Sequence, residues 1–377
     1  MEDGSTHRHV QWFFDNLLPE EQLRSLMAKE ARIPEADAFA LLAYLGSESA
    51  GALSLLPPDA PLPHAHSKRL LTDDALSARI RNLPRISLTA ESPKRMSLAG
   101  AQHKLLVIQE GEQLFEPEGA TASTAILKPE HDNQQHYACS VINGYVTMRI
   151  AQTVGLQVPN VYVRYVPEPV YLIERFDRNG SQSRLHTIDA SQLLGQSRSY
   201  KYTEASLSTL VKIASACAAP AIARQRLFLW LVFNTLMGNN DAHLKNLSFM
   251  VSPQGFHLSP HYDLLCTAAY ETKALSEYAA HWPQSLLTIA LPGASTFADV
   301  RMANLLAAGE VLGIKPVTAK RMVQQLANAL PVAFTKEKQA WVERHQTLNL
   351  PSTQAAEHRV LNVMEHMVLQ EMLQQIT

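Results

Sequence analysis

The sequence predicts an α+β protein in which a mixed, β-rich part is followed by a mostly helical part, and three observations support this. Short runs of β-branched or alternating apolar residues gather between residues 104 and 175. From residue 187 onward, apolar residues recur at helical spacing instead. Four prolines within Pro57–Pro63 indicate a linker. We therefore expect an N-terminal segment and linker over residues 1–62, a small lobe over 63–175 and a helical large lobe over 176–377.

The N-terminal segment should be helical with one strand. Pro19 followed by two glutamates is typical of a helix start. Ala38–Leu45 is rich in alanine and leucine and predicts a second helix, whereas Gly51–Leu56 alternates like a strand. Beyond the linker, a short helix is expected over Leu70–Ile80.

The small lobe should hold a sheet with one inserted helix. Between the second and third expected strands, Tyr137–Val154 carries apolar residues at helical spacing. The expected strands are Lys104–Gln109, Ala125–Lys128, Val161–Val166 and Val170–Arg175.

The large lobe should consist of helices interrupted by one hairpin. Gly238 should end the second of the helices, and Pro253-Gln254-Gly255 should form the turn of the hairpin. The expected helices are Glu204–Cys217, Ala219–Met237, Val300–Leu312, Thr318–Ala329, Val332–Arg344 and Thr353–Ile376, and the strands of the hairpin are Ser248–Val251 and Phe256–Leu258.

Composition excludes several classes of protein. The chain has 377 residues, 46% of them hydrophobic, and a formal net charge of −2, which gives no bulk attraction to nucleic acid or an anionic membrane. Cys139, Cys217 and Cys266 are far apart, which argues against a disulfide framework or a zinc site. We see no signal peptide and no apolar run of the ~20 residues that a membrane span needs. A cytoplasmic protein is expected.

The most informative polar residues lie in Asn239–Asn246 and Pro260–Leu264. Asp241 can orient and deprotonate a hydroxyl, while Asn246 and Asp263 are hard oxygen ligands that can hold Mg²⁺ on ATP phosphates. The spacing from Asp241 to Asn246 equals that of the protein-kinase catalytic loop. Asp263 lacks the Phe-Gly that follows the second Asp in ordinary protein kinases. The pattern therefore predicts phosphoryl transfer on a divergent kinase frame, rather than ordinary caps and turn formers.

Two further residues of the first segment are candidates for supporting roles. Lys245 could neutralise charge on the transferred phosphoryl group. His243 could brace the loop.

Three segments of the small lobe could bind a nucleotide. The small residues of Ser97–Lys104 could let backbone N–H groups approach phosphates, although the loop is no Walker A motif and a plain turn is the alternative. Lys128 ends an apolar strand and could pair with a phosphate, or simply face solvent. Backbone groups of Tyr171–Arg178 could read an adenine edge, and Asp177 could take a ribose hydroxyl. The alternative for this last segment is a structural salt-bridge cluster.

Five ordered motifs resemble those of the HipA-like serine/threonine kinases, the toxins of bacterial toxin–antitoxin pairs. Residues 13–19 and 51–53 also resemble the N-terminal region of that family. The resemblance implies a two-lobed, protein-kinase-like fold and ATP- and Mg²⁺-dependent transfer to a protein Ser or Thr. The motifs are Ser-Leu-Ala-Gly-Ala-Gln-x-Lys at 97–104, Ile-Leu-Lys-Pro at 126–129, Glu-Arg-Phe-Asp-Arg at 174–178, Gly-Asn-Asn-Asp-x-His-x-Lys-Asn at 238–246 and Tyr-Asp-Leu at 262–264.

The resemblance also implies a role for individual residues. Asp241 would be the catalytic base, with Lys245 and His243 beside it, and Asn246 and Asp263 would hold Mg²⁺. Ser97 matches the serine that family members phosphorylate on themselves, and the added charge of about −1.5 to −2 should repel ATP and inactivate the enzyme. The residues expected to contact ATP are Gly100, Ala101, Gln102 and Lys104 in the loop, Lys128 at the phosphates, Glu174 and Phe176 through their backbones at the adenine, and Asp177 at the ribose.

The partners implied by the resemblance are proteins. An aminoacyl-tRNA synthetase is the implied class of substrate, with growth arrest and persistence as the consequence. A small DNA-binding, HipB-like antitoxin is the implied regulator, so that DNA is contacted through the complex and no membrane is involved.

The chain departs from the family pattern in two places. It starts almost directly at the Phe-Asp-Asn-Leu-Leu-Pro motif, whereas full-length relatives begin with a further β-rich segment. We expect either a truncated gene product or the large subunit of a three-component system with a separate HipS-like protein. In addition, Asn143-Gly144 stands where relatives commonly have Asn-Glu, so that Lys128 would lack a partner unless Glu130 substitutes.

Three alternatives remain open on the sequence. The first is a small-molecule kinase of the aminoglycoside type, which uses similar residues. The second is a catalytically inactive binding module for an antitoxin or DNA, which the Gly144 departure favours. The third is a metal hydrolase built from Asp241, His243, His261 and Asp263, for which no zinc-motif spacing is present.

Overall fold

A computed structural model gives the structure of residues 8–57, 59–60, 63, 65–181, 183–276, 278, 280–348 and 351–377. These residues form two compact units, each built from several stretches of the chain. The first unit comprises the residues up to Asp132 together with Pro159–Tyr200 and Ser248–Gln254. The second unit comprises Asn133–Val158, Lys201–Leu247 and Gly255–Thr377.

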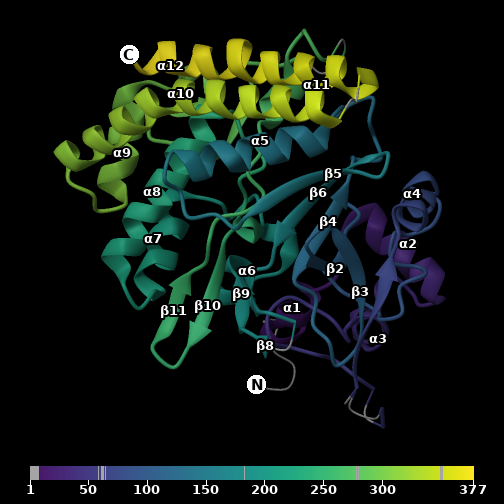
Figure 1. Ribbon diagram of the computed structural model, residues 1–377. Helices are drawn as coiled ribbons and strands as arrows, with labels where there is room; N and C mark the ends of the chain where they lie inside the picture. The colour runs from purple at the N-terminus through teal and green to yellow at the C-terminus, as the bar shows by residue number, and fades with distance from the viewer. Residues whose placement is uncertain are drawn as a thin grey trace. The chain divides into compact units, whose positions relative to one another are not determined.

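The first unit is built around a six-stranded sheet. Its strand order is β1-β3-β2-β4-β6-β5 (Figure 1), and every neighbouring pair is antiparallel. In the inner strand β2, Leu105, Leu106 and Val107 are all fully buried, so both faces of the strand are covered. The strands are His66–Leu71 (β1), Leu105–Glu110 (β2), Gln113–Gly119 (β3), Ala125–Pro129 (β4), Val161–Tyr165 (β5) and Pro169–Glu174 (β6).

The four strands predicted for the small lobe are confirmed as β2, β4, β5 and β6, but the sequence interpretation missed β1 and β3. Strand β1 lies at the edge of the sheet, and five of its six residues are exposed. Lys68 and Arg69 give it the charged character typical of an edge, which hides a strand from a search for apolar alternation. The helix predicted over Leu70–Ile80 is α4, Asp73–Arg81. Its predicted start was wrong, because Leu70 and Leu71 pair with β3.

Three short helices form the N-terminal part of the first unit. They are α1 (His9–Asp15), α2 (Glu21–Ala31) and α3 (Ala38–Leu45). The two predicted helices, α2 and α3, are confirmed, and α1 was not predicted. Asp37 caps α3 by accepting a hydrogen bond from the backbone N–H of Ala40 at 3.0 Å. These helices share an apolar core of their own, formed by Leu17, Leu18, Leu23, Met27, Ala28, Leu41, Leu42 and Leu45.

The strand predicted at Gly51–Leu56 is absent from the structure, and the segment is irregular. Gly51 has a φ of +70°, in the left-handed region that favours glycine. The apolar alternation has another cause, because Leu53 and Leu55 pack against the core of the N-terminal helices. The predicted linker Pro57–Pro63 lies partly outside the described residues.

The remaining elements of the first unit are short. Strands β7 and β8 pair with each other, and β10 pairs antiparallel with β9. These elements are β7 (Arg178–Asn179), β8 (Ser183–Arg184), β9 (Thr187–Asp189), α6 (Ala190–Leu193), the 3₁₀ turn η1 (Arg198–Tyr200) and β10 (Ser248–Ser252).

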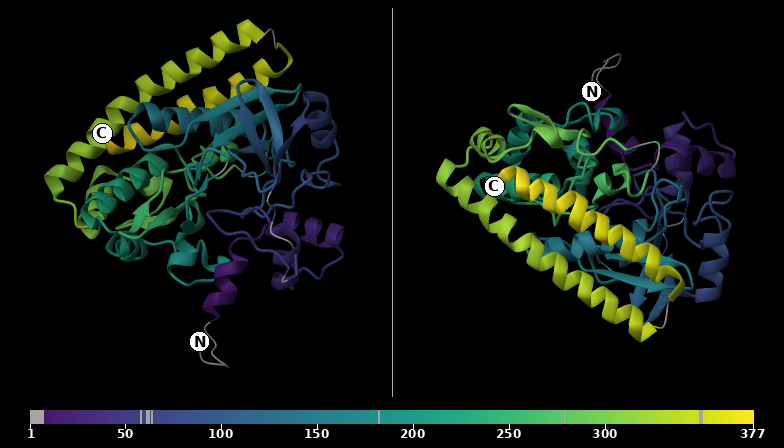
Figure 2. Two further views of the ribbon diagram at one scale, coloured as in Figure 1. Left: turned by 60° about the horizontal axis from the view of Figure 1, so that its bottom comes forward. Right: turned by 90° about the horizontal axis from the view of Figure 1, so that it is seen from above.

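The second unit is mostly helical, and together the two units confirm the predicted α+β class. Helix α10 and the helix formed by α11 and α12 lie side by side (Figures 1 and 2). The helices are α5 (Ser140–Thr153), α7 (Leu207–Ala216), α8 (Pro220–Leu236), α9 (Met302–Val311), α10 (Pro316–Leu348), α11 (Pro351–Val363) and α12 (Gln370–Ile376). The strands and turns are η2 (Leu244–Asn246), β11 (Gly255–Leu258), η3 (Thr267–Glu271), β12 (Leu286–Leu291), β13 (Ala294–Thr296), η4 (Phe297–Asp299) and the π turn η5 (Met364–Leu369).

The two helices predicted at Thr318–Ala329 and Val332–Arg344 are one continuous helix. Pro331 lies inside α10, where it removes one backbone hydrogen bond and would be expected to break the helix. Leu330 and Phe334 on either side of it are fully buried, so tertiary packing holds the helix together across the proline. Strands β12 and β13 were also not predicted.

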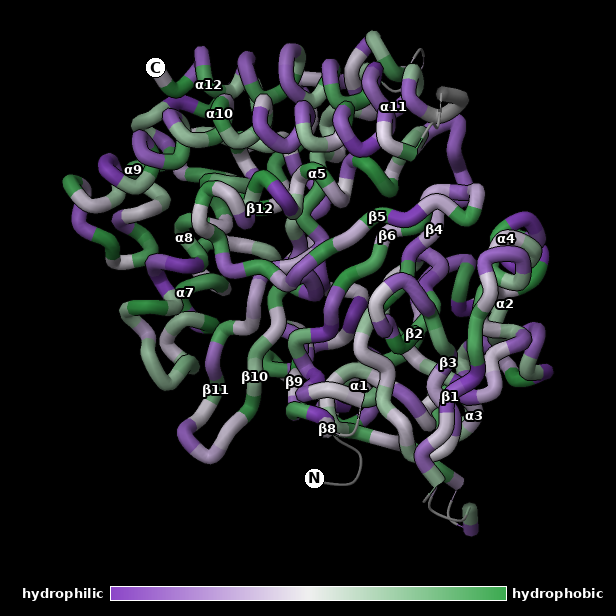
Figure 3. Tube along the Cα trace, in the orientation of Figure 1, coloured by the Kyte–Doolittle hydropathy of each residue, from purple (hydrophilic) through white to green (hydrophobic). Residues whose placement is uncertain are grey.

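The long helices are amphipathic. Hydrophilic and hydrophobic residues alternate along α10, α11 and α12 (Figure 3). Within the part of the chain that the structure describes, no helix combines the length and the apolar character needed to cross a membrane.

Candidate active site

The loop that carries Asp241 starts from a buried helix end. Helix α8 is followed by Gly238, whose φ is +65°. A Cβ atom on this residue would lie 2.5 Å from Val368 and 2.8 Å from Ala268, so only glycine fits here. The side chain of Asn239 then donates to Asn234 of α8 at 2.7 Å and accepts from the N–H of Asp241 at 3.0 Å. The backbone of Asp241 is thereby fixed to the helix.

The same loop is closed by Asn246. Its side-chain nitrogen donates to the carbonyl oxygen of Asp241 at 2.8 Å, so the two predicted site residues hold each other in place. This hydrogen bond uses the amide nitrogen, and the amide oxygen is the group that Asn246 could offer to a cation. The N–H of Leu244 donates to the carbonyl of Lys201 at 3.1 Å and ties the loop to the first residue of its own stretch of this unit.

The carboxylate of Asp241 is accessible and accepts a hydrogen bond from a hydroxyl. Its side chain is 39% exposed, and the hydroxyl of Tyr202 donates to its Oδ1. The Tyr202 ring meets the ring of His243 edge-on, with centroids 4.8 Å apart. His243 is buried, and its Nε2 lies 3.9 Å from Oδ1 of Asp241, which fits the predicted bracing role.

Asp263 lies in a segment that is tied to this loop. The hydroxyl of Tyr262 donates to the carbonyl oxygen of Lys245 at 2.8 Å. Asp263 itself has a φ of +57°, an uncommon conformation for a residue other than glycine that is found at functional sites. The five residues predicted for catalysis and metal binding, Asp241, His243, Lys245, Asn246 and Asp263, therefore all belong to the second unit, in two segments joined by a hydrogen bond.

A second contact fixes the Asp263 segment from the other side. The side chain of Asn143 on α5 accepts from the N–H of Cys266 at 2.8 Å and donates to its carbonyl at 2.9 Å. Asn143 is fully buried, so this reciprocal pair of bonds connects α5 rigidly to the residues that follow Asp263. The sequence interpretation considered Asn143 only as a neighbour of Gly144 and missed this role.

His261 is a packing residue. Its ring stacks on Trp230 at an interplanar angle of 24°. Burial, together with the nearby Arg226, lowers the pKa of His261 to about 3, so the imidazole is neutral. Among the described residues, no three or more His, Cys, Asp or Glu side chains are grouped so that they could hold a metal ion. The metal-hydrolase alternative therefore gains no support, whereas Mg²⁺ usually takes one or two protein oxygens and completes its shell with water and phosphate, which fits Asn246 and Asp263.

The predicted phosphate loop, residues 97–104, is folded onto the first unit. Ser97 is fully buried, and its hydroxyl donates to the carbonyl of Leu17 at 2.8 Å. Gly100 has a φ of +109° and accepts from the N–H of Glu20 at 3.1 Å. The side chain of Gln102 donates to the carbonyl of Pro129 at 3.1 Å, so the loop lies against the end of β4, next to Lys128.

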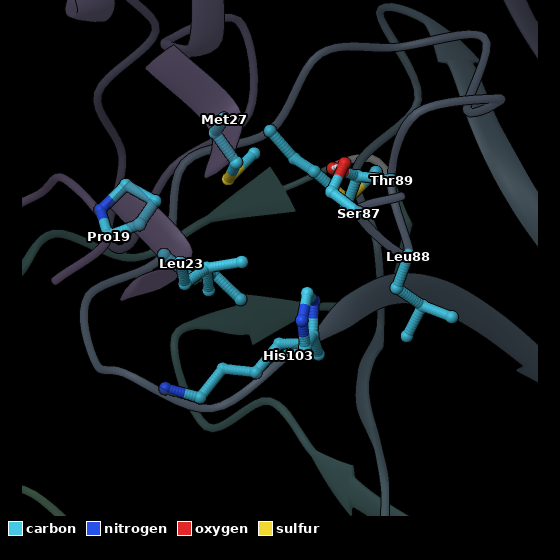
Figure 4. Close-up of a pocket in the computed structure, with 10 residues that line it drawn as sticks. Pro19, Leu23, Met27, Ser87, Leu88, Thr89 and His103 are labelled. Atoms are coloured by element: carbon cyan, nitrogen blue, oxygen red, sulfur yellow. Dashed lines mark hydrogen bonds between the residues drawn. The ribbon is translucent and has the colours of Figure 1, made fainter. Parts of the chain in front are cut away.

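The cavity beside this loop is too small for a nucleotide. It has a volume of about 20 Å³, which leaves room for roughly one water molecule. His103 points into it (Figure 4), and burial lowers the pKa of this imidazole. The cavity is a packing defect between the loop and the N-terminal helices, lined by Pro19, Leu23, Met27, Ser87, Leu88, Thr89, Met96, Leu98, His103 and Lys104.

For Lys128 the structure argues against the alternative of a solvent-facing side chain, whereas for Asp177 it favours the alternative of a structural salt-bridge cluster. Lys128 is only 8% exposed, so it does not project into solvent from the end of β4. Asp177 lies in an ion-pair cluster with Arg175 at 2.7 Å and Arg178 at 3.1 Å, and it accepts from the N–H of Gly51 at 2.7 Å. This arrangement favours the salt-bridge alternative for Asp177, and its contact with ribose stays a prediction.

The contacts of Glu174 and Phe176, the two residues predicted at the adenine, do not distinguish a nucleotide-binding role from a structural one. The side chain of Glu174 accepts from Asn160 at 2.8 Å and Tyr162 at 2.7 Å, and its N–H donates to the carbonyl of Asn160 at 3.0 Å. Phe176 follows directly after β6 and Arg175. Backbone contacts from these residues to adenine stay a prediction.

Comparisons with known proteins confirm the resemblance noted in the sequence. A family model described as the HipA-like C-terminal domain matches residues 96–334, and one described as the HipA N-terminal domain matches residues 2–56. The chain is 33% identical over 291 residues to the serine/threonine-protein kinase toxin HipA of Shewanella oneidensis, covering 71% of this chain and 66% of the relative. It is 37% identical over 283 residues to Y4mE of Sinorhizobium fredii, covering 70% and 66%. The matched regions thus span slightly less than two thirds of the length of these relatives.

The fold comparison agrees with the sequence comparison. A chain in the solved complex of HipA, HipB and operator DNA from Shewanella oneidensis MR-1 matches with a TM-score of 0.75 at 26% identity, covering 97% of this chain and 87% of that one. The predicted two-lobed, HipA-like fold is confirmed by this match. Since the C-terminal family model alone covers more than half of the sequence, the chain belongs to the HipA-like family.

Proposed function

We propose that this chain is an ATP- and Mg²⁺-dependent kinase that phosphorylates a serine or threonine of a protein and acts as a growth-arresting toxin. The observation that carries this proposal is the environment of Asp241. An accessible carboxylate already accepts a hydrogen bond from a hydroxyl group, and its loop is closed by Asn246. This is the arrangement that a base needs in order to activate an acceptor hydroxyl.

In the proposed reaction, Asp241 takes the proton of the acceptor hydroxyl. The acceptor oxygen forms a bond to the γ-phosphorus of ATP, the bond between that phosphorus and the bridging oxygen breaks, and ADP leaves. Lys245 would stabilise the charge of the phosphoryl group. Asn246 and Asp263 would hold Mg²⁺, which when bound neutralises phosphate charge. Lys128 and the backbone of residues 97–104 would contact the phosphates of ATP.

Self-inactivation through Ser97 is part of the proposal. The Ser97 hydroxyl is fully buried and is bonded to Leu17. A phosphate with a charge of about −1.5 to −2 could not keep this buried place, because a phosphate oxygen cannot donate to the carbonyl of Leu17 and burying its charge is costly. The loop would therefore have to leave its place once Ser97 is phosphorylated, and ATP binding by Gly100–Lys104 would be lost.

The proposed partners follow from the relatives. One relative is named a serine/threonine-protein kinase toxin, and its solved structure is a complex with HipB and operator DNA. By analogy, a HipB-like antitoxin would neutralise this chain and bring it to DNA. An aminoacyl-tRNA synthetase as substrate, the cytoplasm as compartment and a HipS-like protein as a further partner rest on the sequence resemblance.

The test is the intact mass of the wild-type chain, Asp241→Asn and Ser97→Ala after incubation with Mg²⁺-ATP. We expect wild type to gain one phosphate on Ser97, Ser97→Ala to gain none there, and Asp241→Asn to react at least ~100-fold more slowly. Glu310→Gln, an exposed acid in the same unit, is the matched control and should behave as wild type. Absence of ATP binding in wild type would favour the inactive binding module, and transfer to an aminoglycoside but not to protein would favour the small-molecule kinase.

A further inference from the structure

A second, much larger pocket lies beside the candidate base, entirely within the second unit. Its volume of about 540 Å³ falls in the range of roughly 300–1,000 Å³ that is usual for ligand sites. Tyr202, which donates to Asp241, and Asn240, the residue before Asp241, both line it. The other lining residues are Glu271, His281, Gln284, Ser285, Leu286, Leu287 and Thr288.

The wall of this pocket is fixed to the catalytic loop through Asn240. The N–H of Asn240 donates to the hydroxyl of Thr267 at 2.8 Å, and its side chain donates to Glu271 at 2.7 Å. Its carbonyl oxygen accepts from the hydroxyl of Thr288 on β12. Because three groups of Asn240 are bonded, the pocket and the Asp241 carboxylate keep a fixed relation to each other.

The chemistry of the pocket does not suit the phosphates of a nucleotide. No lysine or arginine is among the lining residues that the structure describes, whereas phosphate recognition relies on cations or on clustered N–H groups. The pocket instead contains the carboxylate of Glu271, which accepts from Asn240 and from Ser285. The rest of the wall consists of hydroxyl and amide groups, a histidine and two leucines. It suits a neutral, partly apolar ligand.

A hydroxyl in the wall of the pocket already reaches the base. Tyr202 is 45% exposed, and its hydroxyl donates to Oδ1 of Asp241. A ligand hydroxyl that entered from the pocket would need to make the same hydrogen bond to be activated. The position of the Tyr202 hydroxyl therefore marks where an acceptor hydroxyl would bind.

We propose that this pocket binds the protein acceptor, as an uncharged chain segment whose serine or threonine hydroxyl replaces that of Tyr202 on Asp241. An apolar side chain next to the acceptor would lie against Leu286 and Leu287. Leu286 is 69% exposed, so it has apolar surface to cover. Acidic residues beside the acceptor would be disfavoured by Glu271. This assignment rests on the proposed kinase function and names the substrate side of the same site.

The test compares two variants on strand β12 that add the same charge. Leu286→Glu places a carboxylate at the pocket, and Ala290→Glu places one at an exposed position of the same strand that does not line it. Both positions are exposed, so neither change disturbs the core. The acceptors are short synthetic peptides with one central serine and neutral, acidic or basic flanks, assayed with radiolabelled ATP. The measured quantities are KM for peptide and KM for ATP.

We expect wild type to prefer neutral flanks, and Leu286→Glu to raise the KM for the neutral peptide about tenfold or more through the lost apolar contact and the added charge. The KM for ATP should stay unchanged, and Ala290→Glu should match wild type in both. If wild type transfers phosphate and the two variants behave alike, the acceptor assignment is overturned while the kinase function stands. If wild type neither binds ATP nor transfers phosphate, the proposed function fails and the acceptor assignment fails with it.

Discussion

Tyr202 has a role in the candidate site that the sequence interpretation did not assign. Its hydroxyl occupies the hydrogen-bonding position on Asp241 that an acceptor needs. Before the acceptor can bind there, this bond must be broken. A hydrogen bond to a charged group contributes about 1.5–3 kcal/mol, and less where the group is exposed, as Asp241 is. The Tyr202 hydroxyl should therefore weaken acceptor binding only modestly.

We expect Tyr202→Phe to lower the KM for a serine peptide about tenfold or less, because the competing hydroxyl is gone. The KM for ATP should not change. Tyr200→Phe is the matched control, since Tyr200 is 47% exposed and lies two residues away. Steady-state kinetics with radiolabelled ATP measure both constants. A loss of turnover as large as that of Asp241→Asn would contradict competition, and would make Tyr202 a residue that positions the base.

At the scale of single residues, the sequence predicts those site residues that belong to short local motifs. Asp241 and Asn246 could be identified because only four residues separate them in one loop. Asp263 could be identified because it follows Asn246 by 17 residues. The contact between Tyr202 and Asp241 spans 39 residues, so no local pattern reveals it. The surroundings of Asp177 were equally hidden, because they include Gly51, which is 126 residues away.

At the scale of elements, the contact between α5 and the Asp263 segment depends on one side chain. Asn143 is suited to it because an amide both donates and accepts, and the peptide group of Cys266 needs both. Replacing Asn143 by alanine would leave a buried N–H and a buried carbonyl without partners. Each such group costs about 1–3 kcal/mol.

We therefore expect Asn143→Ala to lower the free energy of unfolding by about 2–4 kcal/mol, measured by urea denaturation. The Asp263 segment should also loosen, so that Mn²⁺, used as a paramagnetic substitute for Mg²⁺, binds more weakly. Asn362→Ala on α11 is the control, because Asn362 accepts from Lys338 at 2.7 Å in a half-buried contact and its loss should cost less than the loss of the fully buried Asn143. If both variants lose the same free energy of unfolding, the Asn143 contact contributes no more to stability than the contact of Asn362.

Elements could be predicted where local pattern and burial agree. The apolar strands β2, β4, β5 and β6 are nearly where the sequence places them, and so are the helices α7 and α8. Predictions failed where tertiary packing overrides local preference. Packing continues α10 through Pro331, and it makes the alternation of Gly51–Leu56 a contact with helices instead of a strand pattern.

At the scale of the whole chain, a buried charge cluster joins distant parts of the sequence within the first unit. Glu48 is fully buried, and four basic side chains from two other stretches of the chain surround it. Lys94 lies 2.8 Å from its carboxylate and Arg178 lies 3.1 Å from it, and Arg184 and Arg175 complete the set. Ser97, through its N–H, donates to the backbone carbonyl of Glu48 at 2.7 Å. The cluster therefore supports the loop proposed to bind phosphates.

The charges of this cluster should make the stability of the chain depend on acid pH. Burial alone would raise the pKa of Glu48, but Arg175, Lys94 and Arg184 lower it from 4.5 to about 2. Burial would also raise the pKa of Asp177, but its neighbours, Arg175 above all, lower it to about 2. Because both folded-state pKa values are depressed, their contribution is fully present above the unfolded values and is lost as pH falls through ~4.5 toward ~2.

We expect Glu48→Gln to lower the free energy of unfolding at neutral pH by about 3–5 kcal/mol, because it leaves buried cations with too little countercharge. The variant should also lose less stability on acidification, by about 3 kcal/mol between pH 5 and pH 2, since one of the two depressed carboxylates is gone. Glu310→Gln, at an exposed position of α9, should change neither quantity by more than ~0.5 kcal/mol. Urea denaturation at several pH values across this range measures the free energy of unfolding of each variant. If wild type and Glu48→Gln fall in parallel as the pH drops, the titration of Glu48 does not contribute to acid unfolding. The cluster would then stabilise the first unit by its hydrogen bonds, independently of the charge on that carboxylate.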